Sequence, residues 1–213
     1  MKQIYVFGAS GAYGVGAEHS GWADLLKQSI HHKMYGEDGI GEKYEVYNFA
    51  QPGADVAFVM VTAREQLKYY RRSGETIAVI AVGGNNSKAE DAPDNFVSGI
   101  EDYEQLMSRL LERMKEDVDE IVVVGNSTVD EAKTNPKPNP LTGGQSFFTN
   151  DRRILFNHAL MKLCFKYKVH FVDVDVSSDE WKEKYLYSDG LHPNQAGHQY
   201  IFEKVSTEVE KLL

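Results

Sequence analysis

The feature that most constrains the fold of this chain is a regular alternation of apolar, strand-like runs with helical patterns. Three runs, IAVIAV, IVVV and HFVDV, show little polar alternation, which is typical of strands buried on both faces. Five strands are expected in all: QIYVFG, YEVYNFA, TIAVIAVGG, EIVVVGNS and VHFVDVD, which begin at residues 3, 44, 76, 120 and 169. Helices are expected between and after them, near 20–33, 55–72, 95–116 and 150–168 and from about 194.

Strand–helix alternation predicts right-handed crossovers and a parallel sheet that is covered by helices on both faces. The 213 residues show no linker and no internal repeat, so we expect one domain over 1–213. Ligands of such sheets bind beyond the carboxyl ends of the strands. Small and polar residues follow four of the expected strands at that end: residues 8–10, Gly53, Asn85 and residues 126–128.

Composition excludes several classes of function. A formal net charge of −9 argues against a nucleic acid as partner, because nucleic-acid binders concentrate Lys and Arg. The single cysteine, Cys164, allows no intrachain disulfide and no Cys-based zinc site, and the histidines lack metal-ligand spacing, so no metal is expected. No apolar run approaches the roughly 18 residues of a membrane span. The first run is too short for a signal peptide, so we expect a cytoplasmic protein.

One segment, VDEAKTNPKPNPLTGGQSFFTND, interrupts the alternation. It is rich in Pro, Gly, Asn and Thr and is too long for a plain connection between a strand and a helix. Two interpretations stay open. Residues 129–150 are either an ordered surface loop or a rim or lid over the strand ends, which would supply substrate contacts through Phe147 and Phe148.

The loop after the first strand allows two functions. Gly8, Gly11 and Gly14 have the GxxGxxG spacing of short-chain dehydrogenases, which would indicate an NAD(P) enzyme. Such an enzyme needs an acidic residue after the second strand and a Tyr-x-x-x-Lys pair in mid-chain. The sequence VYNFAQ has no acid there, and Tyr200 and Lys204 in the last helix form the one such pair. The dinucleotide interpretation is therefore the weaker of the two.

The second interpretation is a nucleophilic serine, Ser10, in the same loop. Asp189 precedes His192 by three residues in a turn marked by Gly and Pro, so its carboxylate can fold back onto Nδ1 of the imidazole. An isolated Asp-x-x-His would be read as a turn and an exposed histidine. Here Asn85 and Gly53 follow two other strands, where an amide side chain and an unobstructed backbone N–H can bind an oxyanion.

Together these stretches resemble the SGNH hydrolases, also called the GDSL family. The matching stretches are FGASGAYG with Ser10, NFAQPGAD with Gly53, VGGNN with Asn85 and DGLHP with Asp189 and His192. The resemblance implies a flavodoxin-like α/β/α sandwich with a five-stranded parallel sheet. It also implies hydrolysis of carboxylic esters through an acyl-enzyme, without a metal or organic cofactor.

The same resemblance implies a role for each matching residue. Ser10 is expected to be the nucleophile, His192 its base and Asp189 the acid that orients the base. The N–H groups of Ser10 and Gly53 and the side chain of Asn85 are expected to form the oxyanion hole. The expected partner is a small-molecule ester, and the oligomeric state is not predicted.

Two residues depart from the family pattern. Ala9 stands where the first block usually has Asp, and Asn86 stands where the third block usually ends in Asp. We infer that the loss of two carboxylates makes the site less repulsive to anionic substrates. The alternative is a binding protein on this scaffold that has lost catalysis. Candidate substrate contacts are Tyr13, Asn86, Phe147 and Phe148.

Overall fold

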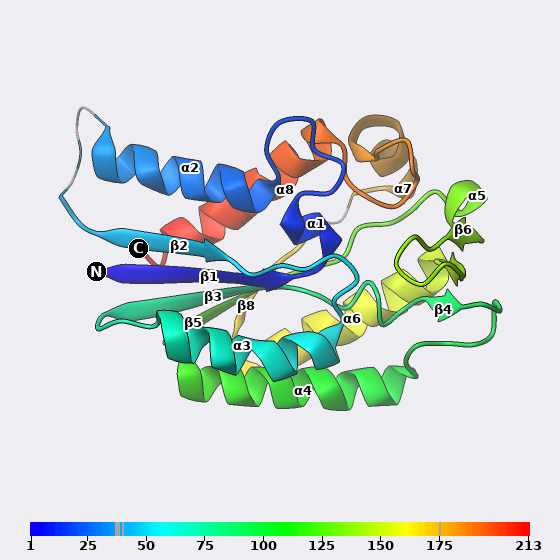
Figure 1. The fold of residues 1–213 in the computed structure, drawn as a ribbon, viewed down its shortest axis with the longest axis horizontal. Helices are drawn as coiled ribbons and strands as arrows, with labels where there is room; N and C mark the ends of the chain where they lie inside the picture. Colours follow the sequence, from blue (N-terminus) through cyan, green and yellow to red (C-terminus); the bar gives the residue numbers. More distant parts are fainter. Residues whose placement is uncertain (37–38, 40, 175) are drawn as a thin grey trace.

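The computed structural model describes residues 1–36, 39, 41–174 and 176–213. Its centre is a parallel sheet of five strands in the order β2-β1-β3-β5-β8 (Figure 1). Counted within this sheet alone, the order is the 2-1-3-4-5 of flavodoxin-like folds, which confirms the predicted fold class. The strands are β1 (Lys2–Gly8), β2 (Tyr44–Asn48), β3 (Glu75–Ala81), β5 (Glu120–Val124) and β8 (His170–Val172).

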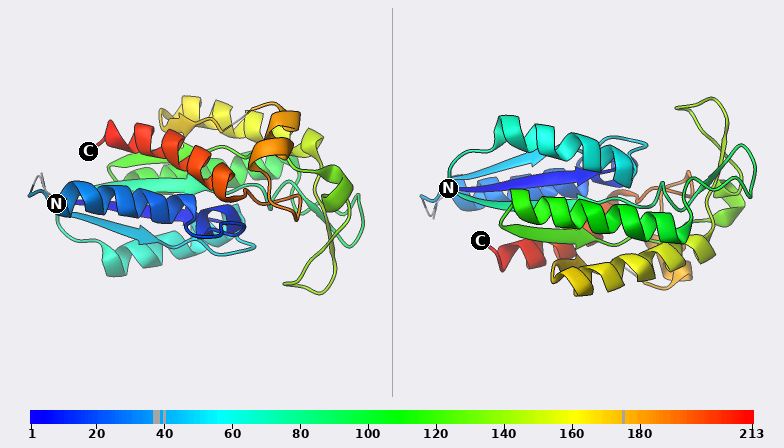
Figure 2. Two further views of the ribbon diagram at one scale, coloured as in Figure 1. Left: turned by 90° about the horizontal axis from the view of Figure 1, so that it is seen from above. Right: turned by 90° about the horizontal axis from the view of Figure 1, so that it is seen from below.

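Helices cover both faces of the sheet (Figure 2). One face is covered by α2 (Trp22–Tyr35) and α8 (Gln195–Glu210), and the other by α3 (Val56–Tyr70), α4 (Ile100–Asp117) and α6 (Asn150–Tyr167). Because side chains alternate along a strand, β1 contributes to both resulting cores. Ile4 and Val6 pack on the α2 and α8 side, and Tyr5 and Phe7 pack on the other; all four are at most 1% exposed. β1 is therefore buried on both faces, although it was not among the three runs for which the sequence predicted burial on both faces.

The predicted elements differ from the observed ones mainly at their ends. The helix expected from residue 95 begins at Ile100, because Phe96 instead forms a β-bridge with Ala89. The strand expected over 169–175 ends at Val172, where its ladder with β5 ends, and residue 175 lies outside the described residues. Strand ends depend on the neighbouring strand rather than on local composition, and this explains the overshoot.

The segment 129–150 carries secondary structure of its own. It contains α5 (Glu131–Thr134), β6 (Lys137–Pro138) and β7 (Gln145–Phe147), and β7 pairs on its other side with β4 (Ala89–Glu90). The resulting antiparallel three-stranded sheet lies beyond the carboxyl ends of the central strands (Figure 1). Three short elements, α1 (Ser10–Tyr13), α7 (Ser178–Glu180) and a π-helical turn (Trp181–Tyr185), complete the described part of the chain.

Candidate active site

Ser10 lies at the start of α1, two residues after the central strand β1 ends. The turn is tight, because a Cβ at Gly8 would lie 2.7 Å from the carbonyl oxygen of Ala81. β1 and β3 are paired over their full length, from Lys2 opposite Glu75 to Gly8 opposite Ala81. The loops that follow these two strands therefore start level with each other at one edge of the sheet.

Asp189 and His192 share the turn that precedes α8. Oδ1 of Asp189 accepts hydrogen bonds from the backbone N–H groups of Leu191 (3.0 Å) and His192 (3.1 Å). Oδ2 lies 2.6 Å from Nδ1 of His192. The three-residue step thus folds the carboxylate back onto the imidazole, and the carboxylate fixes the proton on Nδ1.

The other ring nitrogen of His192 faces the serine. Nε2 lies 2.8 Å from Oγ of Ser10, although the two residues are separated by 182 positions in the chain. The structure therefore brings Ser10, His192 and Asp189 into one continuous line of two hydrogen bonds.

The turn that carries His192 packs closely against the segment that follows Ser10. A Cβ at Gly16 would lie 2.2 Å from the carbonyl oxygen of Pro193, so only glycine allows this approach. His198 of α8 is fully buried; its Nδ1 accepts from the N–H of Trp22 (3.2 Å) and its Nε2 lies 3.1 Å from the carbonyl oxygen of Val15. Burial lowers the pKa of His198, which suits a neutral ring that accepts at Nδ1 and donates at Nε2.

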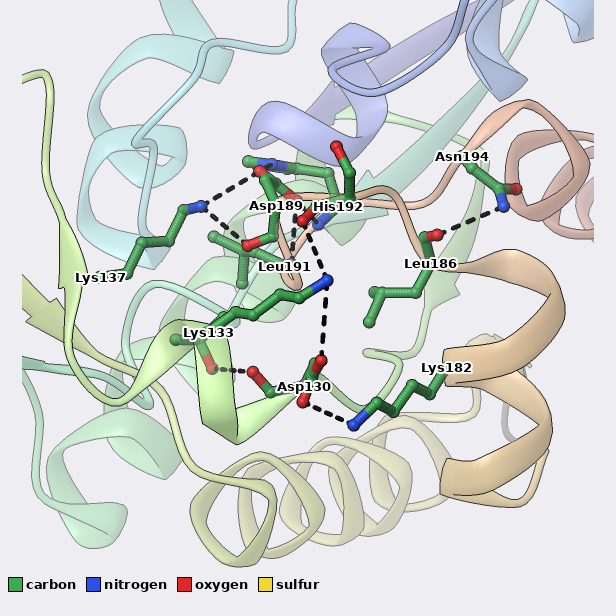
Figure 3. Close-up of polar contacts among 11 residues, drawn as sticks. Asp130, Lys133, Lys137, Lys182, Leu186, Asp189, Leu191, His192 and Asn194 are labelled. Carbon is green, nitrogen blue, oxygen red and sulfur yellow. Dashed lines mark hydrogen bonds and ion pairs between the residues drawn. The ribbon is translucent and has the colours of Figure 1, made fainter.

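Two opposing effects act on the carboxyl group of Asp189. Its burial by itself raises the pKa, but the hydrogen bonds from the His192 ring and from two backbone N–H groups outweigh it. The pKa of Asp189 is consequently held well below its usual range, and the group is a carboxylate at neutral pH. Lys137 approaches the same carboxylate from β6 (Figure 3), with Nζ 3.4 Å from Oδ2.

The candidate oxyanion donors lie on the loops after β1, β2 and β3. The side chain of Asn85 donates one hydrogen bond, of 2.8 Å, to the carbonyl oxygen of Ala54, which leaves its second amide hydrogen without a protein acceptor among the described residues. Gly53 has φ +84°, the left-handed region that favours glycine. Within the described part of the chain, the N–H groups of Ser10 and Gly53 donate no hydrogen bond.

Two cavities meet at Ser10. The smaller has a volume of about 110 Å³ and the larger about 760 Å³. Five residues line both of them: Ser10, Asn85, Phe148, Leu191 and His192. Segment 129–150 lines the larger cavity with eight residues between Lys137 and Ser146 and also supplies Phe148, so the rim interpretation of this segment agrees with its place in the fold.

The candidate substrate contacts differ in where they lie. Phe148 lines both cavities, whereas Tyr13, which is 57% exposed, and Phe147 line neither. Asn86 is buried and also lines neither cavity, because both ends of its amide are used inside the protein. Its Oδ1 accepts from the N–H of Val56 and its Nδ2 donates to Oγ of Ser98.

Three residues at the site were not singled out from the sequence: Lys137, Leu141 and Arg153. Asn126, which follows β5, is one of the residues that the sequence placed at the carboxyl edge of the sheet, although without a role. Arg153 had no sequence signal, since an arginine within a helical pattern is normally exposed. Among the described residues, no cluster of three or more His, Cys, Asp or Glu side chains is placed to hold a metal ion. None of the described helices is both long and apolar enough to cross a membrane.

Comparison with known proteins places this geometry in a family. The chain matches a lipase/acylhydrolase from Enterococcus faecalis with 15% identity and a TM-score of 0.74, over 100% of this chain and 97% of that one. It matches an acetylxylan esterase from Geobacillus stearothermophilus, Axe2, with 16% identity and a TM-score of 0.69, over 97% and 93%. It matches the esterase EstA from Pseudoalteromonas sp. with 13% identity and a TM-score of 0.68, over 99% and 97%.

At these identities the structural matches show the fold. No functionally curated protein sequence matches the chain. The sequence profile of the GDSL-like lipase/acylhydrolase family matches residues 6–200, a span that includes the turns of Ser10 and His192. The chain therefore belongs to the GDSL-like lipase/acylhydrolase family and is an enzyme that hydrolyses ester bonds.

Proposed function

We propose that the protein is a serine esterase or deacylase that acts through an acyl-enzyme, with Ser10, His192 and Asp189 as its triad. The observation that carries this proposal is the unbroken line from Oγ of Ser10 through the imidazole to Oδ2 of Asp189, with distances of 2.8 and 2.6 Å. A hydroxyl is a weak nucleophile until a base accepts its proton, and this arrangement supplies both the base and the group that orients it.

In the first half-reaction, Nε2 of His192 accepts the proton of Ser10 as Oγ attacks the ester carbonyl. Asp189, as a carboxylate, stabilises the imidazolium that forms. The imidazolium then donates this proton to the departing alcohol, and the acyl group stays on Oγ as an ester. Proton transfer by a positioned histidine contributes roughly 10²- to 10⁴-fold to such rates.

The negative charge on the carbonyl oxygen develops toward three donors: the N–H groups of Ser10 and Gly53 and the side-chain amide of Asn85. Donors that need no reorganisation act most strongly where water is excluded. In the second half-reaction, His192 accepts a proton from water, which attacks the acyl-enzyme. Collapse of the second tetrahedral intermediate releases the acid and returns the proton to Ser10.

The proposal is tested by intact-mass labelling with a fluorophosphonate probe, which reacts with activated serines. We expect one label per chain in the parent protein, none in Ser10→Ala and strongly slowed labelling in His192→Ala. Ser127→Ala is a matched control, because Ser127 lines the small cavity but makes no hydrogen bond to His192. Labelling that persists in Ser10→Ala, or no labelling of the folded parent, would contradict the proposed nucleophile.

A further inference from the structure

A buried arginine without a counter-ion lies in the small cavity beside Ser10. Arg153 of α6 is 8% exposed, and the single hydrogen bond of its side chain among the described residues runs from Nε to the carbonyl oxygen of Ser127, at 2.6 Å. It has no ion pair within the described part of the chain. Burial lowers the pKa of Arg153 to about 10, so the guanidinium still carries its charge at neutral pH. Buried charges are normally paired, and the terminal nitrogens of this one face a cavity.

A second donor without a partner lines the same cavity. Nδ2 of Asn126 is buried and makes no hydrogen bond within the described residues, although the backbone N–H of Asn126 is held by Oδ1 of Asn157 at 2.8 Å. The two side chains converge at Gly84. A Cβ there would lie 3.1 Å from Nη1 of Arg153 and 3.2 Å from Oδ1 of Asn126. The guanidinium of Arg153 therefore lies beside the amide of Asn126, and a guanidinium presents a fork of N–H donors that matches a carboxylate.

Among the described residues, no Asp or Glu lines this cavity, and the titratable side chains that line it are those of Arg153 and His192. Ala9, which stands where the family pattern has Asp, also lines this cavity. Apart from His192, which is hydrogen-bonded to Asp189, the charged side chain on the described part of this wall is therefore the cation Arg153, in a chain whose net charge is −9.

The sizes of the two cavities indicate whether the acyl part or the alcohol part of the substrate carries the negative charge. A volume of about 110 Å³ holds a short chain of a few heavy atoms, since one water needs only about 10–15 Å³ by the same measure. The acyl group stays on Ser10 between the two half-reactions, whereas the alcohol must leave. The cavity of about 760 Å³ on the other side of Ser10 suits the departing alcohol.

We propose that the small cavity is a carboxylate subsite formed by Arg153 and Asn126, and that the preferred substrates are half-esters of short dicarboxylic acids. The ester carbonyl lies at Ser10 and the distal carboxylate binds the guanidinium of Arg153. This inference rests on the proposed function, because it takes Ser10 as the acylated residue.

The first experiment compares two substrates that differ in one charge. Monomethyl glutarate carries the distal carboxylate, and methyl glutaramate replaces it with a neutral amide of the same shape; methanol release gives kcat/KM for each. In the parent protein we expect the carboxylate ester to be preferred. In Arg153→Met the ratio of the two kcat/KM values should fall at least about tenfold, as expected for loss of a hydrogen-bonded charge partner.

Two variants serve as controls. Arg152→Met removes the neighbouring arginine, which donates to the carbonyl oxygens of Ser87 and Ser98, stacks on Phe96 and lines neither cavity. The Arg152→Met variant should keep the parent's ratio of the two kcat/KM values. Asn126→Asp keeps the shape of the side chain and places a carboxylate against Arg153, so it should lower the ratio even if Arg153→Met fails to fold.

Binding provides a readout that does not depend on turnover. Glutarate titrated into the Ser10→Ala protein should bind saturably in a calorimeter, and binding should be lost when Arg153→Met is added. The outcomes also separate the two proposals. Turnover of methyl glutaramate that requires Ser10, with a ratio unchanged in Arg153→Met and Asn126→Asp, would overturn the subsite and leave the esterase intact. Absence of both turnover and fluorophosphonate labelling would instead overturn the proposed function, and glutarate binding would then decide the subsite alone.

Discussion

Nζ of Lys137 donates a 2.9 Å hydrogen bond to the backbone carbonyl oxygen of Asp189 and lies 3.4 Å from Oδ2 of the same residue (Figure 3). Lys137 belongs to β6 in the segment 129–150, and its side chain is 20% exposed. The contact ties the wall of the larger cavity to the turn that carries Asp189 and His192. Under the proposed function, substrate binding and the orientation of His192 by Asp189 thus share one side chain.

Replacing Lys137 by Met should loosen this wall while leaving the imidazole contacts in place. We expect KM to rise about 3- to 10-fold and kcat to fall less, which corresponds to roughly 1 kcal/mol of lost interaction. Steady-state kinetics on one ester measures both. Lys133→Met is the matched control, because Lys133 donates to the neighbouring carbonyl oxygen of Ser188 but lines neither cavity. Equal effects of the two substitutions would contradict a specific role for Lys137.

Asp189 should also make the stability of the protein depend on pH. Because its pKa is lowered in the folded state, its contribution is fully present above the ordinary carboxyl pKa of about 3.9 and is lost as the pH falls below it. Asp189→Asn should therefore lower the free energy of unfolding by about 1 kcal/mol at pH 7, after allowance for solvent screening. Urea unfolding at pH 7, 5 and 3 would measure this, and the difference between parent and variant should shrink below pH 4. A difference that stays constant down to pH 3 would argue against the lowered pKa.

Substitution by alanine should mainly affect catalysis at Asn85 and mainly affect stability at the adjacent Asn86. Asn85→Ala removes a proposed oxyanion donor and should lower kcat about 10²- to 10³-fold with little change in KM or in thermal stability. Asn86→Ala removes two buried hydrogen bonds, to Val56 and Ser98, and should lower the free energy of unfolding by about 1–3 kcal/mol. Kinetics and thermal melts on both variants test the pair. A large loss of kcat in a fully folded Asn86→Ala protein would assign Asn86 to the site after all.

Gly53 should not tolerate a side chain. Its φ of +84° disfavours any L-residue by about 1–2 kcal/mol, and a Cβ would lie 2.7 Å from Cδ1 of Leu141. Gly53→Ala should therefore both destabilise the protein and lower kcat/KM, because the N–H of residue 53 is displaced. Adding Leu141→Ala relieves the contact but not the backbone strain, so less than half of the lost stability should return. Full recovery in the double variant would show that the contact alone was responsible.

Much of the fold and part of the candidate site could be predicted from local sequence patterns. The alternation of apolar runs and helical patterns is a property of short windows, so a parallel sheet covered on both faces followed from it, and the flavodoxin-like strand order followed from the family resemblance. β1 and α4 lie within a few residues of their predicted places. The step from Asp189 to His192 is equally local. Three residues in a tight turn suffice to place a carboxylate oxygen 2.6 Å from the imidazole.

Other features were predicted incompletely because their partners are remote in the chain. The strands β4, β6 and β7 are only two or three residues long and pair with one another. Because they are so short, no periodic sequence pattern predicts them. Asn86 is a candidate substrate contact by sequence, but the fold turns its side chain inward, toward Val56 and Ser98.

The sequence by itself determined the layered fold, the residue types of the site and the strand ends after which they lie, because these depend on periodicity and on spacings of a few residues. Only the tertiary structure decided that Ser10 meets His192 across 182 positions, that Lys137 reaches Asp189, and that Arg153 is buried with no counter-ion among the described residues. Helical periodicity gives the direction of an arginine on its helix, but its charge environment is set by what the rest of the chain packs against it.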